Sequence, residues 1–122
     1  MLGRGGKQLV HEMSLCEGVL QIIESEARNQ NFSKVKRVIL DVGVLSGVEI
    51  PALEFAFEVV MRGSVAEHAT LEINELEAQA WCMQCAEVVT VKQRYDACPK
   101  CESYQLQISS GDELKIKELE VD

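Results

Sequence analysis

Four cysteines in two C-x-x-C pairs carry the clearest chemistry of this sequence. Cys82 and Cys85 form the first pair, and Cys98 and Cys101 follow after an arm of twelve residues. In each pair a tight turn points two thiolates at one centre and backbone N–H groups at the sulfurs, and the arm can form a hairpin that brings the pairs together. Four thiolates favour tetrahedral Zn²⁺ in a closed structural site. Iron in a rubredoxin-like site and a pair of disulfides are the alternatives.

Composition and charge limit the compartment and the partners. The 122 residues carry a net charge of −8, which argues against binding to a phosphate backbone. No apolar run approaches the ~20 residues that a membrane span needs. The opening nine residues lack the apolar core of a secretory leader. We therefore expect the protein to lie in the reducing cytoplasm, where disulfides are rare.

The elements that must position these cysteines follow from hydrophobic spacing. Apolar residues at helical intervals predict a first helix, and β-branched runs predict strands. Proline in the first turn and Gly63 at the stop fit a second helix. The predicted elements are helices over about residues 12–30 and 51–62, and strands over about 35–44, 70–81, 88–91, 104–108 and 113–116. The last two strands flank a turn at residues 109–112 and predict a hairpin.

The fold predicted from these elements is of the α+β class. Two helices on one face of a mixed three-stranded sheet form a small two-layer α/β domain, and a zinc ribbon is inserted into it. The predicted α/β domain comprises residues 10–80 plus 109–122, and the ribbon comprises residues 81–108. Residues 1–9, rich in glycine and basic side chains, are expected to be a disordered leader, a tag or a misassigned start.

The second set of candidate metal ligands is the pair His11-Glu12. The structural interpretation is that Glu12 favours the positive end of the first helix and that His11 is merely exposed. A histidine at the second position of a chain, however, can chelate a metal together with the terminal amine and the intervening amide nitrogen. Nitrogen donors in a square plane suit Ni(II) or Cu(II). In the numbered chain His11 is too far from the start for this chelate.

The segment from Val10 to Cys16 resembles the Met-His-Glu-x-Ser-Leu-Cys start of the HypA/HybF family, the nickel metallochaperones of [NiFe]-hydrogenase maturation. The resemblance continues in the same order to residue 122. It includes Leu40-Asp41-Val42-Gly43-Val44-Leu45-Ser46-Gly47-Val48-Glu49, Phe55-Ala56-Phe57-Glu58, Gly63-Ser64-Val65-Ala66-Glu67, Ala80-Trp81 with both cysteine pairs, and the run from Gly111 to Val121.

This resemblance implies a nickel-binding α/β domain that carries an inserted zinc domain. The implied nickel ligands are a terminal methionine amine, His11 and Glu12, the last chiefly through its backbone nitrogen. Glu49 falls where some members carry a carboxylate of that site. Val10 stands where the family begins with Met, and a GUG start codon, read as Met, would reconcile the two. Translation would then begin at position 10, whereas a genuine nine-residue leader would remove the amine.

The implied function is a metallochaperone that binds Ni(II) transiently and delivers it to [NiFe]-hydrogenase, with structural Zn(II). The implied partners are a nickel-handling GTPase and the hydrogenase large-subunit precursor; a homodimer is left open. The alternative is a zinc-ribbon adaptor that binds a protein or nucleic acid and carries no second metal.

We expect Cys16 to be packed and His68 to be exposed. No nucleophile–base pair or paired carboxylates point to an enzyme.

Overall fold

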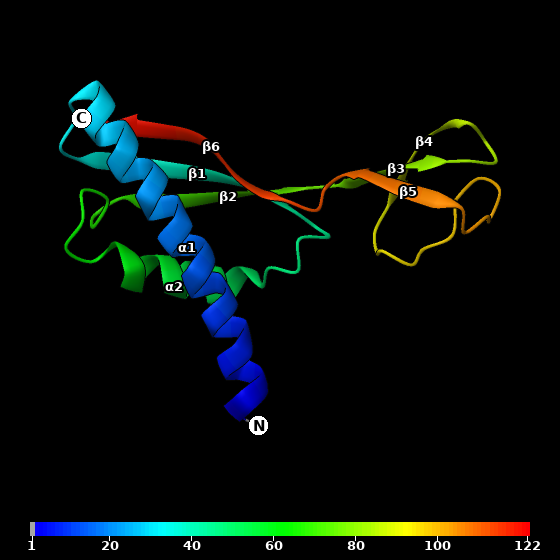
Figure 1. The fold of residues 1–122 in the computed structure, drawn as a ribbon, viewed down its shortest axis with the longest axis horizontal. Coiled ribbons are helices and arrows are strands. Elements are labelled where there is room, and N and C mark those ends of the chain that lie inside the picture. Colours follow the sequence, from blue (N-terminus) through cyan, green and yellow to red (C-terminus); the bar gives the residue numbers. More distant parts are fainter. Residues whose placement is uncertain (1) are drawn as a thin grey trace. The chain divides into compact units, whose positions relative to one another are not determined.

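The computed structural model describes the backbone of residues 2–122 and the side chains of residues 10–122. In chain order the elements are α1 (Leu2–Gln30), β1 (Val35–Gly43), α2 (Ile50–Met61), β2 (Thr70–Leu76), β3 (Ala78–Cys82), β4 (Glu87–Val91), β5 (Leu106–Ser110) and β6 (Leu114–Val121) (Figure 1). The chain divides into two compact units. Unit 1 contains the chain up to Leu40, Val48–Glu72 and Ile116–Asp122, and unit 2 contains Asp41–Gly47 and Ile73–Lys115.

In unit 1, helix α1 begins earlier than its sequence predicts. It starts at Leu2 rather than near Glu12, so the backbone of residues 2–9 is helical. The reason is that extending an existing helix is far easier than starting one, and no proline interrupts this stretch. The interpretation of residues 1–9 as a disordered leader, a tag or a misassigned start remains a prediction.

Helix α2 confirms the start and stop signals of the sequence. Glu49 is its N-cap residue and proline occupies its first turn, while Gly63, with a φ of 76°, lies just beyond its end. Its inner side packs against α1 through residues at helical spacing. The buried apolar residues are Leu53, Ala56, Phe57 and Met61 in α2, with Cys16, Val19, Ile23 and Ala27 in α1.

The first sheet has the strand order β2-β1-β6 and is mixed, as predicted. Arg37 pairs with Glu72 and Asp41 pairs with Asn74, so positions increase together along β1 and β2, as in a parallel pair. Along β6 the order is reversed, because Arg37 also pairs with Glu120 while the Gly43 N–H donates to the Glu113 carbonyl. The helix between β1 and β2 is the crossover that parallel strands require.

The predicted hairpin around residues 109–112 does not form. Strand β5 lies in the second sheet and β6 lies in the first. The connecting Gly111 has a φ of 93°, and a Cβ there would lie 2.4 Å from the Ala78 Cα. The glycine signal was therefore correct, but it marks a close backbone crossing between sheets instead of a two-strand turn. The predicted strand over residues 70–81 is likewise divided at Glu77 into β2 and β3.

The second sheet, of order β4-β3-β5, lies in unit 2 and is antiparallel. Its inner side forms a small core with the cysteines: Leu45, Ala78, Ala80, Cys82, Val89, Val91 and Cys98 are buried there. Leu45 comes from the loop after β1, and its backbone is fixed at both ends. Its N–H donates to the Gly111 carbonyl at 2.8 Å, and its carbonyl accepts from Arg94 at 3.3 Å. The predicted ribbon, residues 81–108, lies within this unit, whose bounds are wider.

Candidate metal centres

The structure brings the four predicted zinc ligands together. The four Sγ atoms of Cys82, Cys85, Cys98 and Cys101 all lie within 4.8 Å of one another, and they are the one such metal-ligand cluster among the side chains described, residues 10–122. The Sγ atoms of Cys82 and Cys101 are 3.6 Å apart, and those of Cys85 and Cys98 are 3.9 Å apart. Disulfide sulfurs would be about 2.0 Å apart, so these cysteines are free.

The spacing of the sulfurs fits zinc. A Zn–S bond of about 2.3 Å in a tetrahedron places any two sulfurs about 3.8 Å apart. The two measured distances of 3.6 and 3.9 Å lie on either side of that value. The donor set and the geometry therefore agree with a closed four-thiolate zinc site, in which Cys82, Cys85, Cys98 and Cys101 would hold the ion.

Both cysteine pairs are built on the same local turn. The N–H of Ala86 donates to the Cys82 carbonyl and the N–H of Glu102 donates to the Cys98 carbonyl, each at 2.8 Å. Ala86 and Glu102 have positive φ angles of 54° and 63°. Within the turns, the N–H of Cys85 points at the Cys82 sulfur and that of Lys100 at the Cys98 sulfur, each at 3.4 Å, as the sequence predicted. Such N–H groups stabilise thiolate charge.

The thiols differ in their tendency to ionise. Burial opposes ionisation of Cys98, but the backbone N–H groups of Cys101 and Lys100 outweigh it and lower the Cys98 pKa to about 7. A hydrogen bond with Cys101 and burial raise the pKa of Cys85 to about 12. Without a cation, the cluster therefore cannot carry four thiolates near neutral pH. A divalent cation would compensate their charge, with release of protons.

The predicted nickel residues lie in unit 1, where α1 meets the start of α2. His11 is about half exposed, whereas the Glu12 carboxylate is fully buried. The Oε2 atom of Glu12 accepts a hydrogen bond from the Glu49 N–H at 2.9 Å and lies 3.6 Å from His11 Nδ1. Glu12 thus faces a helix N-terminus, but it is that of α2, because α1 begins ten residues earlier.

The side chains of His11, Glu12 and Glu49 do not form a three-ligand cluster among residues 10–122. Glu49 is exposed, and the contact shown is to its backbone nitrogen. A site that uses backbone nitrogens would not be seen as a side-chain cluster. The ligand set for nickel is therefore a prediction that rests on the sequence.

Two residues considered for metal binding behave as expected. Cys16 is buried and its Sγ lies 3.8 Å from the Leu53 carbonyl, while His68 is exposed. Burial, followed by the charges of Glu12 and Glu17, raises the pKa of Cys16 to about 11, which keeps it a neutral packing group. Sequence reasoning missed the burial of the Glu12 carboxylate, since an acid near a helix start is usually exposed.

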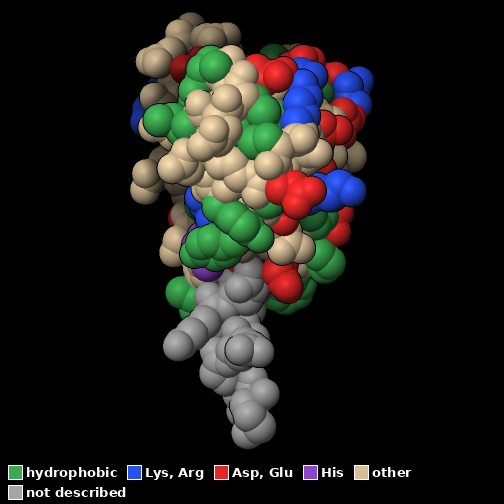
Figure 2. Space-filling view, turned by 90° about the vertical axis from the view of Figure 1, so that its right-hand side faces the viewer, with side chains coloured by type: hydrophobic (Ala, Val, Ile, Leu, Met, Phe, Trp, Pro, Cys, Tyr) green, Lys and Arg blue, Asp and Glu red, His purple; other side chains and the backbone are tan. Residues whose placement is uncertain are grey.

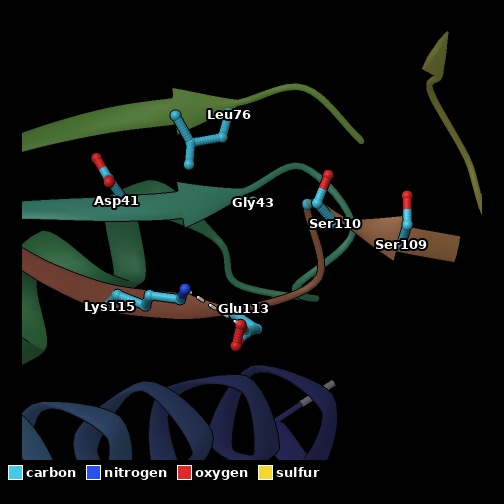
Figure 3. A pocket seen from close by; sticks show the side chains of 8 residues that line it. Asp41, Gly43, Leu76, Ser109, Ser110, Glu113 and Lys115 are labelled. Atoms are coloured by element: carbon cyan, nitrogen blue, oxygen red, sulfur yellow. Dashed lines mark ion pairs between the residues drawn. The ribbon is translucent and has the colours of Figure 1, made fainter. Parts of the chain in front are cut away.

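Unit 2 also contains a polar pocket of about 200 Å³ beside Gly43 and Gly111 (Figure 3). Its charged groups are already paired. Lys115 lies 3.6 Å from Glu113, and Asp41 accepts a hydrogen bond from Asn74 at 3.3 Å. These pairs leave the cysteine cluster as the metal centre that the side chains of unit 2 support.

The fold and the cysteines define a small α+β protein with a four-cysteine cluster that fits a structural metal. Comparison with known proteins identifies the family of this chain. The family described as "Hydrogenase/urease nickel incorporation, metallochaperone, hypA" matches residues 10–121. A hydrogenase maturation factor HypA of Alkalilimnicola ehrlichii is 58% identical over 113 residues, and one of Azotobacter chroococcum is 54% identical. Each alignment covers 93% of this chain and all of the relative.

Similar solved structures point to the same family. The solution structure of the Ni metallochaperone HypA from Helicobacter pylori matches with a TM-score of 0.69 and 27% identity, over 90% of this chain and 96% of that one. A second HypA solution structure matches with a TM-score of 0.70 and 28% identity, over 93% and 97%. The chain therefore belongs to the HypA family of nickel metallochaperones, which are maturation factors and not enzymes.

Proposed function

We propose that this protein binds Ni(II) at His11 and Glu12 in the cytoplasm and delivers it for maturation of [NiFe]-hydrogenase. The family match supports this, because it begins at position 10, directly before His11. The observation that carries the proposal is the exposure of His11 beside a fixed neighbour. An exposed imidazole can take up a metal and surrender it to a partner, which a buried ligand cannot do easily.

The backbone explains why the start of the chain matters. In an α-helix each N–H bonds to the carbonyl four residues earlier, and only the first four N–H groups are left over. With α1 running from Leu2, the amides of His11 and Glu12 lie inside the helix. In a chain that begins at position 10 they belong to the first four. They can then lose their protons and bind nickel in the plane of the amine and imidazole.

Zinc has a different role in this proposal. The ion held by Cys82, Cys85, Cys98 and Cys101 would fix the ribbon, because the small core of unit 2 includes the ligands themselves. We propose the corresponding division into an α/β domain, residues 10–80 plus 109–122, and a zinc-ribbon domain, residues 81–108. Glu49 is retained as a further nickel residue, since its backbone contacts Glu12.

The proposed partners are a nickel-handling GTPase and the hydrogenase large-subunit precursor. Among residues 2–122 no helix is long and apolar enough to cross a membrane. On the face shown in Figure 2, Lys and Arg side chains lie among Asp and Glu side chains and form no continuous basic surface. With the net charge of −8, this disfavours a nucleic-acid partner.

A nickel titration of the zinc-loaded protein tests the proposal. We expect one Ni(II) per chain, lost in His11→Ala with zinc retained. His68→Ala is the matched control, because His68 is the other histidine and is exposed. If the wild-type chain binds no nickel once its four thiolates are filled, the zinc-ribbon adaptor is the better account.

A further inference from the structure

The start of helix α2 depends on a group from another helix. Its N-cap residue, Glu49, makes no side-chain capping hydrogen bond. In a capping box, an acidic side chain three residues into the helix would accept from the N-cap N–H. That position is Ala52, which has no acceptor. The Glu12 carboxylate of α1 accepts from the Glu49 N–H instead, at 2.9 Å.

A second hydrogen bond joins the same two helices at equal spacing. Glu12 reaches Glu49, and one turn later Cys16 reaches Leu53, so partners differ by 37 positions in both cases. The Glu12 contact is the stronger of the two. It is a charge-assisted hydrogen bond to a helix N-terminus, whereas the second joins a weak thiol donor to a carbonyl at 3.8 Å.

His11 adjoins the stronger contact. Its imidazole is half exposed, and its Nδ1 atom lies 3.6 Å from the same carboxylate oxygen that holds α2. Fixing Glu12 fixes the backbone on both sides of the Glu12 nitrogen, which is one of the proposed nickel donors. The side chain of Glu12 and its backbone nitrogen can therefore serve the site in different ways.

We propose that the Glu12 carboxylate is a positioning residue for nickel. It caps α2 from α1 and thereby fixes the His11-Glu12 backbone in the place where nitrogen donors must converge. This inference rests on the proposed function and adds to it. The metal is bound by nitrogen, and the carboxylate acts through the Glu49 N–H and not as a ligand.

Two substitutions of Glu12 separate positioning from ligation. Glu12→Gln keeps a carbonyl oxygen that can accept from Glu49, so nickel affinity should stay within roughly threefold of wild type. Glu12→Ala removes the acceptor and should weaken nickel binding roughly tenfold or more, the usual loss for a hydrogen bond to a charged group. The same variant should speed hydrogen exchange of the Glu49 amide by a similar factor. Each is measured in the full chain and in the chain that begins at position 10 as methionine.

The decisive variant is Glu12→Ala combined with Ala52→Glu. The new glutamate can complete a capping box within α2 and restore the slow exchange of the Glu49 amide, but it cannot hold α1. Nickel affinity should therefore stay low. Cys16→Ala is the matched control, because it removes the hydrogen bond to the Leu53 carbonyl between the same helices and should leave nickel affinity within roughly threefold of wild type.

The outcomes are distinct. If Glu12→Gln loses as much affinity as Glu12→Ala, the carboxylate charge acts directly on the metal and the inference is wrong. Full recovery of nickel binding in the double variant, or no loss in Glu12→Ala, would also overturn it. A wild-type chain that binds no nickel in a His11-dependent manner would instead remove the proposed function, and the inference with it.

Discussion

The thiolate cluster and the His11 segment are prepared for a metal to very different degrees. Every cysteine ligand sits on a tight turn closed by a 2.8 Å backbone hydrogen bond, and two of the four are buried with the core of a sheet. His11 is half exposed on a helix, and a single side chain next to it is anchored. A site with all donors fixed suits retention, whereas one with an exposed donor beside an anchored neighbour suits transfer.

Removing one thiolate should give the largest effect and test the structural role of zinc. In Cys98→Ser we expect loss of bound zinc and unfolding of the ribbon, because structural zinc binding is coupled to folding. Zinc content by atomic emission and the fluorescence of Trp81, the single tryptophan, report on the ribbon. The helices of unit 1 should persist by far-UV circular dichroism. Unchanged zinc content and ribbon order would refute the four-thiolate assignment.

The backbone crossing in unit 2 should be nearly as sensitive. A Cβ on Gly43 would lie 2.1 Å from the Gly111 carbonyl oxygen, and neither backbone can yield easily. We expect Gly43→Ala to lower the free energy of unfolding by about 3 kcal/mol or more. Gly18→Ala is the control, since nothing lies within 4 Å of the added atom; it should gain about 0.5–1 kcal/mol in helix α1. Equal effects in chemical denaturation would contradict the crossing.

Cys16 gives unit 1 a pH dependence of its own. Burial raises the pKa of this thiol from 9.0 to about 11 in the folded chain. The stability it contributes is therefore complete below pH 9 and is lost as the pH rises through 11. We expect the free energy of unfolding to fall by up to about 2–3 kcal/mol over this range. Cys16→Ala should flatten the slope, and identical slopes in denaturant titrations would argue against a buried neutral thiol.

The smallest effect concerns the two like turns around zinc. Glu102 has a φ of 63°, a conformation that favours glycine. Glu102→Gly should therefore stabilise the zinc-loaded protein by up to about 1 kcal/mol. Ala86→Gly, at the equivalent place in the first turn, should change the thermal midpoint in the same direction. A loss of stability in both variants would contradict the predicted gain from glycine at these positive φ angles, and changes of opposite sign would show that the two turns are not equivalent.

The sequence predicted the parts whose signals are local. The C-x-x-C spacing, the strand before Gly43 and the proline and glycine at the ends of α2 each act within a few residues, and each was confirmed. The turn signal at residues 109–112 was also local, but glycine is needed there because Ala78 approaches it from a different strand. No sequence window reveals such a contact.

The candidate nickel site shows the same limit. The sequence around His11 gives no sign that the Glu12 carboxylate is buried. That carboxylate accepts a hydrogen bond from Glu49, which lies 37 positions away. The start of α1 was misjudged because glycine-rich composition suggests disorder, while a stable helix beyond it favours extension. The role of residues 1–9 is therefore tested by whether nickel binding needs a free amine directly before His11. Composition alone does not decide it.

The most direct test compares nickel binding by two zinc-loaded chains, the 122-residue chain and one that begins at position 10 as methionine. The shorter chain should bind one Ni(II) in a diamagnetic, square-planar form, with affinity rising steeply as the pH rises above about 6.5, where histidine loses its proton. The longer chain should bind weakly and with higher coordination. Equal affinities and identical absorption spectra for the two chains would contradict the amine–histidine chelate and the contrast between the two metal centres.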